Sequence, residues 1–265
     1  MPILTGFPPS NLIIPDQGVN FNIMEPQERV SVIDPIDPEQ IIILAPHLEQ
    51  YTDLIAEEMA KKLGCYAVIN RGWERDEKVD FMNDKANCNS IAHLYHDVVR
   101  EEFLDPIFNF ASKIRRAQFV NIYIFIIHGF VCPIKDGPEI VLGFGSGAKR
   151  LSCNRWRKNA FAYHLQTEGF NVHAGKAGGK FAGSGKDNLN QLFKRENPIE
   201  NSNNGLPFTW GIDDSIHSLQ LEIDMCWRES EQDATFAAEA ISRAVESLVE
   251  LGDEGFEKDI KLPEY

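Results

Sequence analysis

The sequence contains no CxxC pair, no close cysteine cluster and no recognisable secretory signal. Its cysteines are odd in number and scattered, at Cys65, Cys88, Cys132, Cys153 and Cys226, which is typical of reduced thiols rather than of a disulfide framework. A structural metal site built from cysteines is therefore not expected. The first residues lack the basic segment and the continuous apolar segment that a secretory signal needs, so we expect a cytoplasmic protein.

The sequence also has few basic residues and no long apolar run. Lysine and arginine number 26 against 40 acidic residues, for a formal net charge of -14. This balance argues against a nucleic-acid partner, because phosphate binding depends on lysine and arginine. The longest apolar run, around 119–127, has the length of a buried strand rather than of a membrane-spanning helix, so no membrane partner is expected. A local group of arginines can still bind a small anion inside a negative protein.

The sequence does contain enough apolar residues for one large core. Hydrophobic residues make up 43% of the 265 residues, and neither an internal repeat nor a linker is visible, so we expect a single domain over 1–265. Residues 1–40 contain seven prolines. Because proline has no backbone donor, this segment is expected to form a surface arm or short edge strands.

Short apolar runs alternate with stretches of helical periodicity. The run 41–47 is too short for a helix and predicts a buried strand, and a helix capped by Thr52 or Asp53 is expected to end at Gly64. A second strand at 66–70 completes a strand–helix–strand unit. Such a unit is typical of an α/β fold with a largely parallel sheet flanked by helices.

The rest of the sequence extends this sheet. Residues 119–129 carry aromatic and β-branched residues on both faces, which predicts a central strand covered on both sides. Further strands are expected at 139–145, 170–174 and 218–224, and helices at 90–116 (interrupted near Pro106), 154–168 and 233–251. The polar stretches 71–89 and 175–210 are expected to be long loops, which are more often functional than not when they are ordered.

Two of the predicted strands end in a histidine, at His47 and at His128. Ligands of open α/β sheets bind beyond the carboxyl ends of the strands, so two imidazoles delivered there from neighbouring strands could bind one metal ion. Glu49 could add a carboxylate and leave a fourth position open for water, as in catalytic zinc sites, with Asp53 as the alternative third ligand. For either histidine alone, a hydrogen bond to a loop is the ordinary explanation.

An open metal site of this kind needs a general base, and Glu222 is the candidate. In the strand 218–224 the period of two puts the apolar side chains on one side and Gln220, Glu222 and Asp224 on the other. A carboxylate in the middle of a strand is costly to bury without a partner. We therefore predict that Glu222 takes a proton from the metal-activated water and passes it to the leaving nitrogen. A structural salt bridge to Arg228 or to a lysine is the alternative.

Four segments carry a recognisable order of motifs. Residues 43–83 contain a strand that ends in Pro-His, a helix, an Asn-Arg pair and an Asp-hydrophobic-Asn motif. The order continues with the His-Gly at 128–129, with 164–183, and with 218–228, where a Gln-hydrophobic-Glu-hydrophobic strand precedes an arginine. Over most of 41–228 these segments resemble the N-formylglutamate amidohydrolase family and, more distantly, enzymes that cut poly-γ-glutamate.

The resemblance implies a zinc-carboxypeptidase-like fold, with a mixed sheet between helices, and hydrolysis of an amide attached to an amino acid. It implies that His47 and His128 bind Zn2+ and that Glu222 is the base. It also implies a small amide substrate that bears a carboxylate. An arginine guanidinium can bind such a carboxylate through two hydrogen bonds. The substrate-binding candidates are Arg71, Asn83 and Arg228.

Two departures from the family pattern keep other functions open. Leu48 and Glu49 stand where the family has small residues, and Asp84 stands where an Asp-Leu-Asn-Arg motif has its arginine. The hypotheses are a zinc hydrolase of an N-acyl amino acid such as N-formylglutamate, a carboxypeptidase or γ-glutamyl hydrolase on the same fold, and a non-catalytic binding protein that keeps the fold. The predicted ligands also suit divalent ions other than zinc.

Overall fold

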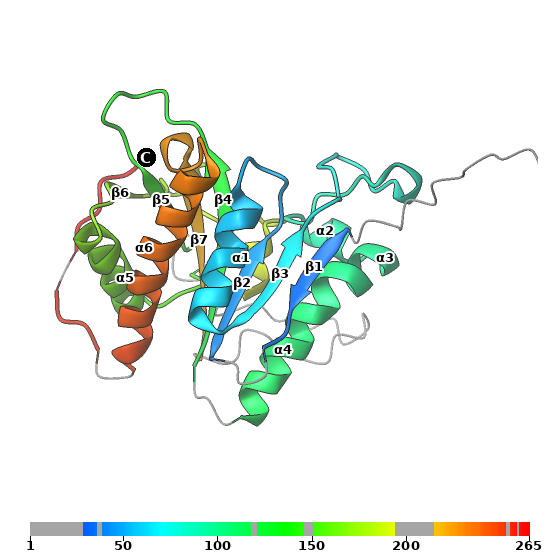
Figure 1. The fold of residues 1–265 in the computed structure, drawn as a ribbon, viewed down its shortest axis with the longest axis horizontal. Coiled ribbons are helices and arrows are strands. Elements are labelled where there is room, and N and C mark those ends of the chain that lie inside the picture. The colour runs from blue at the N-terminus through cyan, green and yellow to red at the C-terminus, as the bar shows by residue number, and fades with distance from the viewer. Residues whose placement is uncertain are drawn as a thin grey trace, which may run out of the picture.

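A seven-stranded sheet runs through the described part of the chain (Figure 1). The computed structural model describes residues 29–35, 39–117, 121–145, 151–193, 215–252, 255–258 and 260–265. In spatial order the strands are β1 (Val30–Ile33), β3 (Tyr66–Asn70), β2 (Ile41–Ala45), β4 (Ile122–Phe130), β7 (Ile216–Asp224), β5 (Ile140–Gly143) and β6 (Val172–Ala174). The four strands from β3 to β7 are parallel, whereas β1 and the β5–β6 pair run antiparallel to them. The predicted mixed, largely parallel sheet is therefore confirmed.

Helices cover both faces of this sheet. They are α1 (Thr52–Leu63), α2 (Ile91–Leu94), α3 (Asp97–Val99), α4 (Asp105–Arg116), α5 (Arg155–Thr167) and α6 (Glu231–Glu250). In β2, Ile41 and Ile43 pack with α1, α5 and α6, and Ile42 and Leu44 pack with α4 and the shorter helices. All four side chains are at most 2% exposed. Strands buried on both faces appear in a sequence as unbroken apolar runs, which is why 41–47 and 119–129 could be recognised.

The first helix has the predicted bounds but not the predicted cap. Gly64 adopts the left-handed conformation (φ 58°) that ends α1. At the start of α1 the N-cap is Tyr51, with φ 56°, and no side chain caps the helix. The hydroxyl of Thr52 instead donates to the carbonyl of Glu49 at 2.9 Å. This bond closes a tight turn between His47 and α1.

The helical stretch 90–116 is interrupted before Pro106 rather than at it. α2 ends at Leu94, α3 begins at Asp97, and a π-helical turn over Arg100–Leu104 leads into α4. Pro106 lies in the first turn of α4. The residues before it are already helical, and proline has no backbone N–H to donate to them. Pro106 therefore lies where the π-helical turn passes into α4 and does not end the helix.

Parts of the predicted arm and loops lie outside the described residues. β1 is an antiparallel edge strand beside β3, as expected of short edge strands within 1–40, whereas 1–28 are not described. The loop 71–89 contains a 3-10 turn at Phe81–Asn83. The described part of 175–210 contains another, at Leu189–Phe193.

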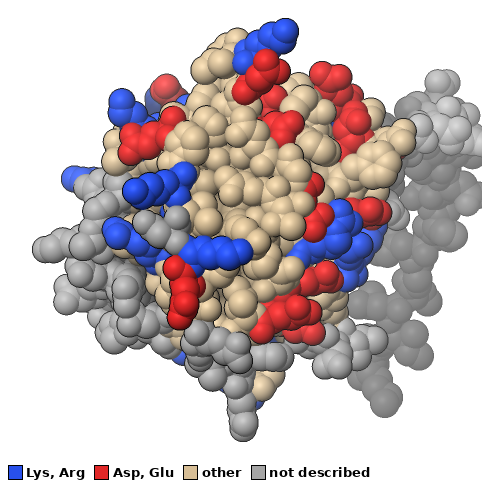
Figure 2. All heavy atoms as spheres, turned by 90° about the vertical axis from the view of Figure 1, so that its left-hand side faces the viewer, with Lys and Arg blue, Asp and Glu red and all other residues tan. Residues whose placement is uncertain are grey.

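The described surface carries charges of both signs. Acidic and basic side chains are interspersed on the side of α5 and β6 (Figure 2). Arg243 of α6, for example, pairs with Glu168, just beyond α5, at 2.7 Å; such an exposed pair contributes at most about 1 kcal/mol. No helix among the described residues is long and apolar enough to cross a membrane.

Candidate metal centre

The structure brings the two strand-end histidines together. β2 and β4 are parallel neighbours, with Leu44 opposite Ile126, so their carboxyl ends lie at the same edge of the sheet. His47 follows β2, and His128 lies near the end of β4. Their ring centroids are 4.8 Å apart at an interplanar angle of 66°. The two side chains are only 5% and 2% exposed, so both imidazoles are removed from bulk water.

Glu49 completes a three-residue cluster with these histidines. Its Oε1 lies 3.4 Å from Nδ1 of His47 and its Oε2 lies 3.7 Å from Nδ1 of His128. The backbone N–H of Gly129 donates to Glu49 Oε2 at 2.6 Å and fixes the carboxylate. One ligand atom from each of the three residues lies within 4.8 Å of the other two. Asp53, the alternative ligand, is turned away and pairs with Arg71.

The polar atoms of the cluster fit a metal ion. His47 Nδ1 and His128 Nε2 are buried without a hydrogen-bond partner among the described residues, and such atoms are rare in folded proteins unless an ion or water satisfies them. Two histidine nitrogens and a carboxylate oxygen also form the three-ligand set of several catalytic zinc sites. The cluster is therefore a candidate His–Glu–His metal site.

The protonation states of the cluster also suit a cation. Burial alone raises the pKa of Glu49, but its interactions with His128 and His47 outweigh burial and lower the pKa well below its ordinary value. Burial lowers the pKa of His128, although the contact with Glu49 opposes that shift. An ionised carboxylate and a neutral imidazole are the forms that bind metal ions.

Glu222 lies directly beside this cluster. β7 is the next strand after β4, and Glu222 is opposite His128 in the register. Burial first, and then the negative charge of Glu49, raises the pKa of Glu222 to about 8. Gln220 Nε2 donates to Glu222 Oε1 at 2.6 Å and opposes that rise, and Gln220 Oε1 in turn accepts from Asn188 at 3.2 Å. A carboxyl group with a pKa this close to neutral can both take up and release a proton.

No protein-family model and no curated protein matches the sequence. Gene product Atu2144 from Agrobacterium tumefaciens is a solved structure of similar shape, with a TM-score of 0.53 and 12% identity over 85% of this chain and 97% of that one. N-formylglutamate amidohydrolase from Ralstonia eutropha JMP134 matches with a TM-score of 0.50 and 10% identity over 84% and 96%.

The chain has the fold of N-formylglutamate amidohydrolase. A bacteriophage poly-gamma-glutamate hydrolase is also similar, with a TM-score of 0.48 and 15% identity over 85% of this chain and 92% of that one. The zinc-carboxypeptidase-like fold that the sequence motifs predicted is confirmed. At these identities the likeness concerns the fold alone.

On this fold, two predicted substrate-binding residues are engaged by the protein itself. The guanidinium of Arg71, just after β3, pairs with Asp53 and Glu57 of α1. Asn83 lies on the exposed 3-10 turn and donates to Asp80 at 2.7 Å. A substrate carboxylate would have to displace Asp53 and Glu57 to reach Arg71, and the substrate-binding role of both residues stays a prediction.

Arg228 is held still more firmly. It is 2% exposed, and its guanidinium donates to the carbonyls of Ile223 at 3.0 Å, Gln50 at 2.5 Å and Phe130 at 3.1 Å. These carbonyls belong to β7, to the turn after His47 and to β4, which are the elements that supply Glu222, Glu49 and His128. A side chain at Gly129 would overlap the guanidinium, so that glycine is required by close packing. The structure gives Arg228 a structural role at the site, and a substrate contact remains a prediction.

We expect Arg228→Lys to lower the free energy of unfolding by roughly 2–4 kcal/mol, because an ammonium group cannot reach all three buried carbonyls. Urea unfolding of the metal-free protein measures this. Arg243→Lys, on the exposed pair with Glu168, should change stability by less than about 0.5 kcal/mol. Unchanged stability of Arg228→Lys together with a raised KM would instead support contact with substrate.

Several asparagine and glutamine residues that support the site were not identified from the sequence. Asn70, at the end of β3, donates to the carbonyls of Pro46 at 3.0 Å and Trp73 at 2.8 Å, and so fixes the chain just before His47. Asn87 contacts His47, and Gln220 contacts Glu222. A polar residue that ends an apolar strand, as Asn70 does, could have been found in the sequence. Asn87 lies among several other polar loop residues and carries no such signal.

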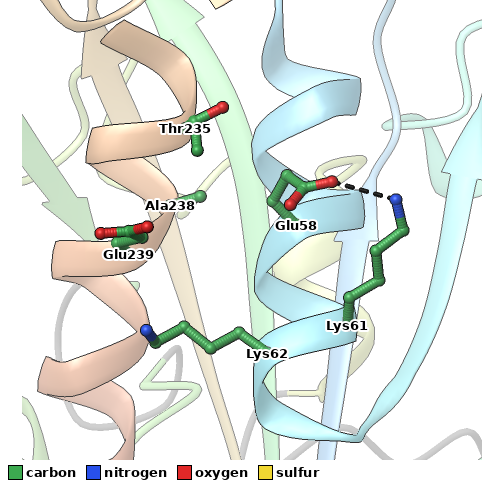
Figure 3. A pocket seen from close by; sticks show the side chains of 6 residues that line it. All are labelled: Glu58, Lys61, Lys62, Thr235, Ala238 and Glu239. Atoms are coloured by element: carbon green, nitrogen blue, oxygen red, sulfur yellow. Dashed lines mark hydrogen bonds and ion pairs between the residues drawn. The ribbon is translucent and has the colours of Figure 1, made fainter. Parts of the chain in front are cut away.

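A surface groove lies away from this centre. It measures about 320 Å³ and lies between α1 and α6 (Figure 3). It is lined by Glu58, Lys61, Lys62, Thr235, Ala238 and Glu239. Its lysines and glutamates largely neutralise one another, as in the pair between Lys61 and Glu58 at 3.0 Å. The groove therefore has no net positive charge that would favour an anionic substrate.

Proposed function

We propose that the chain is a zinc-dependent hydrolase that cleaves the amide bond of an N-acyl amino acid such as N-formylglutamate. The observation that carries this proposal is the cluster of His47, Glu49 and His128 beside the buried carboxyl group of Glu222. The sequence motifs and the fold support the same reaction class. The substrate would be a small amide that bears a carboxylate.

Each group at the edge of the sheet has a distinct role in the proposed reaction. His47, Glu49 and His128 would hold the ion, which when bound supplies Lewis acidity that polarises a carbonyl and lowers the pKa of water to about 7. Glu222 would accept a proton from the attacking water and deliver it to the leaving nitrogen. Gln220 keeps the Glu222 carboxyl group in place through the 2.6 Å hydrogen bond. Burial of the cluster strengthens these interactions because little water screens them.

A metal assay tests whether the chain binds zinc through His47 and His128. We expect protein purified without a nickel-affinity step to contain close to one zinc ion per chain and the His47→Ala, His128→Ala double variant to contain none. Asp53→Ala is the matched control and should retain zinc, because Asp53 pairs with Arg71 outside the cluster. Elemental analysis after dialysis provides the measurement. A wild-type protein that fails to bind added zinc would rule out the mechanism.

A carboxypeptidase or γ-glutamyl hydrolase is the second candidate, since the sequence motifs also resemble enzymes that cut poly-γ-glutamate. Turnover of N-formyl and N-acetyl amino acids, of γ-glutamyl dipeptides and of ordinary peptides under identical conditions separates the two candidates. Activity confined to γ-glutamyl or peptide bonds would favour the second.

A non-catalytic binding protein is the third candidate. The feature that favours it is the turn at residues 80–84, where Asp84 replaces the arginine of the family motif and Asn83 bonds to Asp80. This candidate predicts saturable binding of a carboxylate ligand without metal-dependent turnover of any amide in the panel.

A further inference from the structure

His47 has a second contact on the side of its ring away from Glu49. Its Nε2 lies 3.0 Å from Oδ1 of Asn87, which belongs to the long loop between β3 and α2. The contact is sheltered, because His47 is 5% exposed. Asn87 is therefore a close partner of a proposed metal ligand, although the two residues are distant in the sequence.

The orientation of the Asn87 amide follows from the backbone. The N–H of Asn89 donates to Asn87 Oδ1 at 3.0 Å. A backbone N–H can only donate, so the oxygen and not the NH2 group must face it. The same oxygen faces His47, and an oxygen that accepts requires Nε2 of His47 to carry the hydrogen. A neutral imidazole has one N–H, so its lone pair is left on Nδ1.

The Nδ1 atom freed in this way is the one that faces the cluster. It lies 3.4 Å from Glu49 Oε1 and has no hydrogen-bond partner among the described residues. In the opposite tautomer, Nδ1 would carry a hydrogen and could not bind a metal ion. The hydrogen bond to Asn87 thus selects the tautomer that can bind one.

Asn87 is itself fixed from two further directions. Its backbone N–H donates to Nδ1 of His93 at 2.9 Å, and its carbonyl accepts from the backbone N–H of Ser90 at 2.8 Å. His93 Nε2 lies 3.2 Å from the carbonyl of Glu77, which anchors that ring within the same loop. The loop 71–89 therefore holds the Asn87 amide at a defined position beside His47.

We propose that Asn87 is a positioning residue that locks His47 in the Nε2–H tautomer and thereby presents the Nδ1 lone pair for metal binding. The contact of His47 Nε2 with Asn87 is present without a metal, and it competes with Glu49, whose interaction with His47 favours a hydrogen on Nδ1. Its effect on metal affinity rests on the proposed function. Outer partners of histidine ligands commonly change metal affinity by about 10–100-fold when they are removed.

The tautomer is tested without any metal. In the full-length, metal-free protein labelled with 15N, long-range proton–nitrogen correlation spectra should show His47 with its hydrogen on Nε2. Asn87→Leu should shift the ring to a mixture of tautomers or to the Nδ1–H form. Asn87→Asp keeps an acceptor oxygen and should restore the Nε2–H form, and it also serves if the leucine variant fails to fold. An Nδ1–H ring in the wild type, or no change in Asn87→Leu, would overturn the proposal.

Zinc affinity, measured by competition with a chelating dye, tests the consequence. Asn87→Leu should bind zinc about 10–100-fold more weakly than the wild type, and Asn87→Asp at least as tightly as the wild type. Asn89→Ala is the matched control in the same loop, because its backbone donor to Asn87 is kept. Equal zinc affinity of the wild type and Asn87→Leu would overturn the proposal while the proposed function stood. A wild type that binds no zinc would instead defeat the proposed function, and the metal-free spectra would still decide the role of Asn87.

Discussion

Glu222→Gln is expected to lower the turnover of an N-acyl amino acid by about 10²–10⁴-fold while zinc stays bound. A positioned general base or acid contributes a factor of this size, and glutamine keeps the shape of the side chain but cannot accept the proton. The hydrogen bond from Gln220 at 2.6 Å already holds the carboxyl group in place. The substitution should therefore abolish proton transfer with little change in the position of the side chain. The measurement is kcat with zinc content determined on the same samples.

The control for this variant is Glu239→Gln on α6. Glu239 lines the groove between α1 and α6 and not the metal centre (Figure 3), so the substitution should leave turnover unchanged. Full activity of zinc-loaded Glu222→Gln would remove Glu222 from the mechanism. Loss of zinc together with activity would instead show that Glu222 helps to bind the ion.

The second large effect is a dependence of stability on pH in the metal-free protein. The pKa of Glu222 is about 8 in the folded protein because of burial and the charge of Glu49, whereas an unfolded glutamate titrates near about 4.3. Between these values the folded state binds more protons than the unfolded state, so stability falls as pH rises. Below this window the carboxyl group is protonated in both states and the penalty vanishes. Above it the folded protein carries the full cost of a buried, ionised Glu222.

Glu222→Gln removes this penalty and should be more stable than the wild type at pH 9, by an amount on the order of 5 kcal/mol. At pH 5 the difference should fall to about 1 kcal/mol. The comparison between variants is needed because burial also lowers the pKa of His128, which makes stability rise with pH up to about 6.5 in both proteins. Urea unfolding in the presence of a chelator at pH 5, 7 and 9 measures the difference. Parallel stability curves for the two proteins would contradict the raised pKa.

Much of the candidate metal site could be predicted from local sequence. His47 and His128 each follow an apolar run that is recognisable as a buried strand, and strand ends are where ligands bind in this class of fold. Glu222 stood out because it is a carboxylate in the middle of a strand whose other face is apolar. Each of these inferences needed only a short window of residues and the period of two of a β-strand.

The partners of the arginines could not be predicted in the same way. Arg71 and Arg228 follow strands, as substrate-binding residues often do, but their actual partners come from α1 and from three separate chain segments. A guanidinium binds a protein carboxylate or a row of carbonyls as readily as it binds a substrate. Which of these it meets depends on packing between segments that are far apart in the sequence.

The sequence alone determined the strands and helices that build the core, the face on which each strand residue lies, and two histidines that could approach a metal, with Glu49 or Asp53 as the third ligand. These properties are local, because they follow from the 2.0 and 3.6 periods of apolar residues and from the conformations that glycine and proline allow. Only the tertiary structure decided that β4 lies between β2 and β7, which brings His47, His128 and Glu222 to one edge. It also decided which nitrogen of His47 is free, since that depends on the amide of Asn87 in a distant loop. Such contacts depend on how separate segments pack and on which buried polar groups they satisfy in one another. The periodicity of apolar residues in the sequence does not predict these contacts.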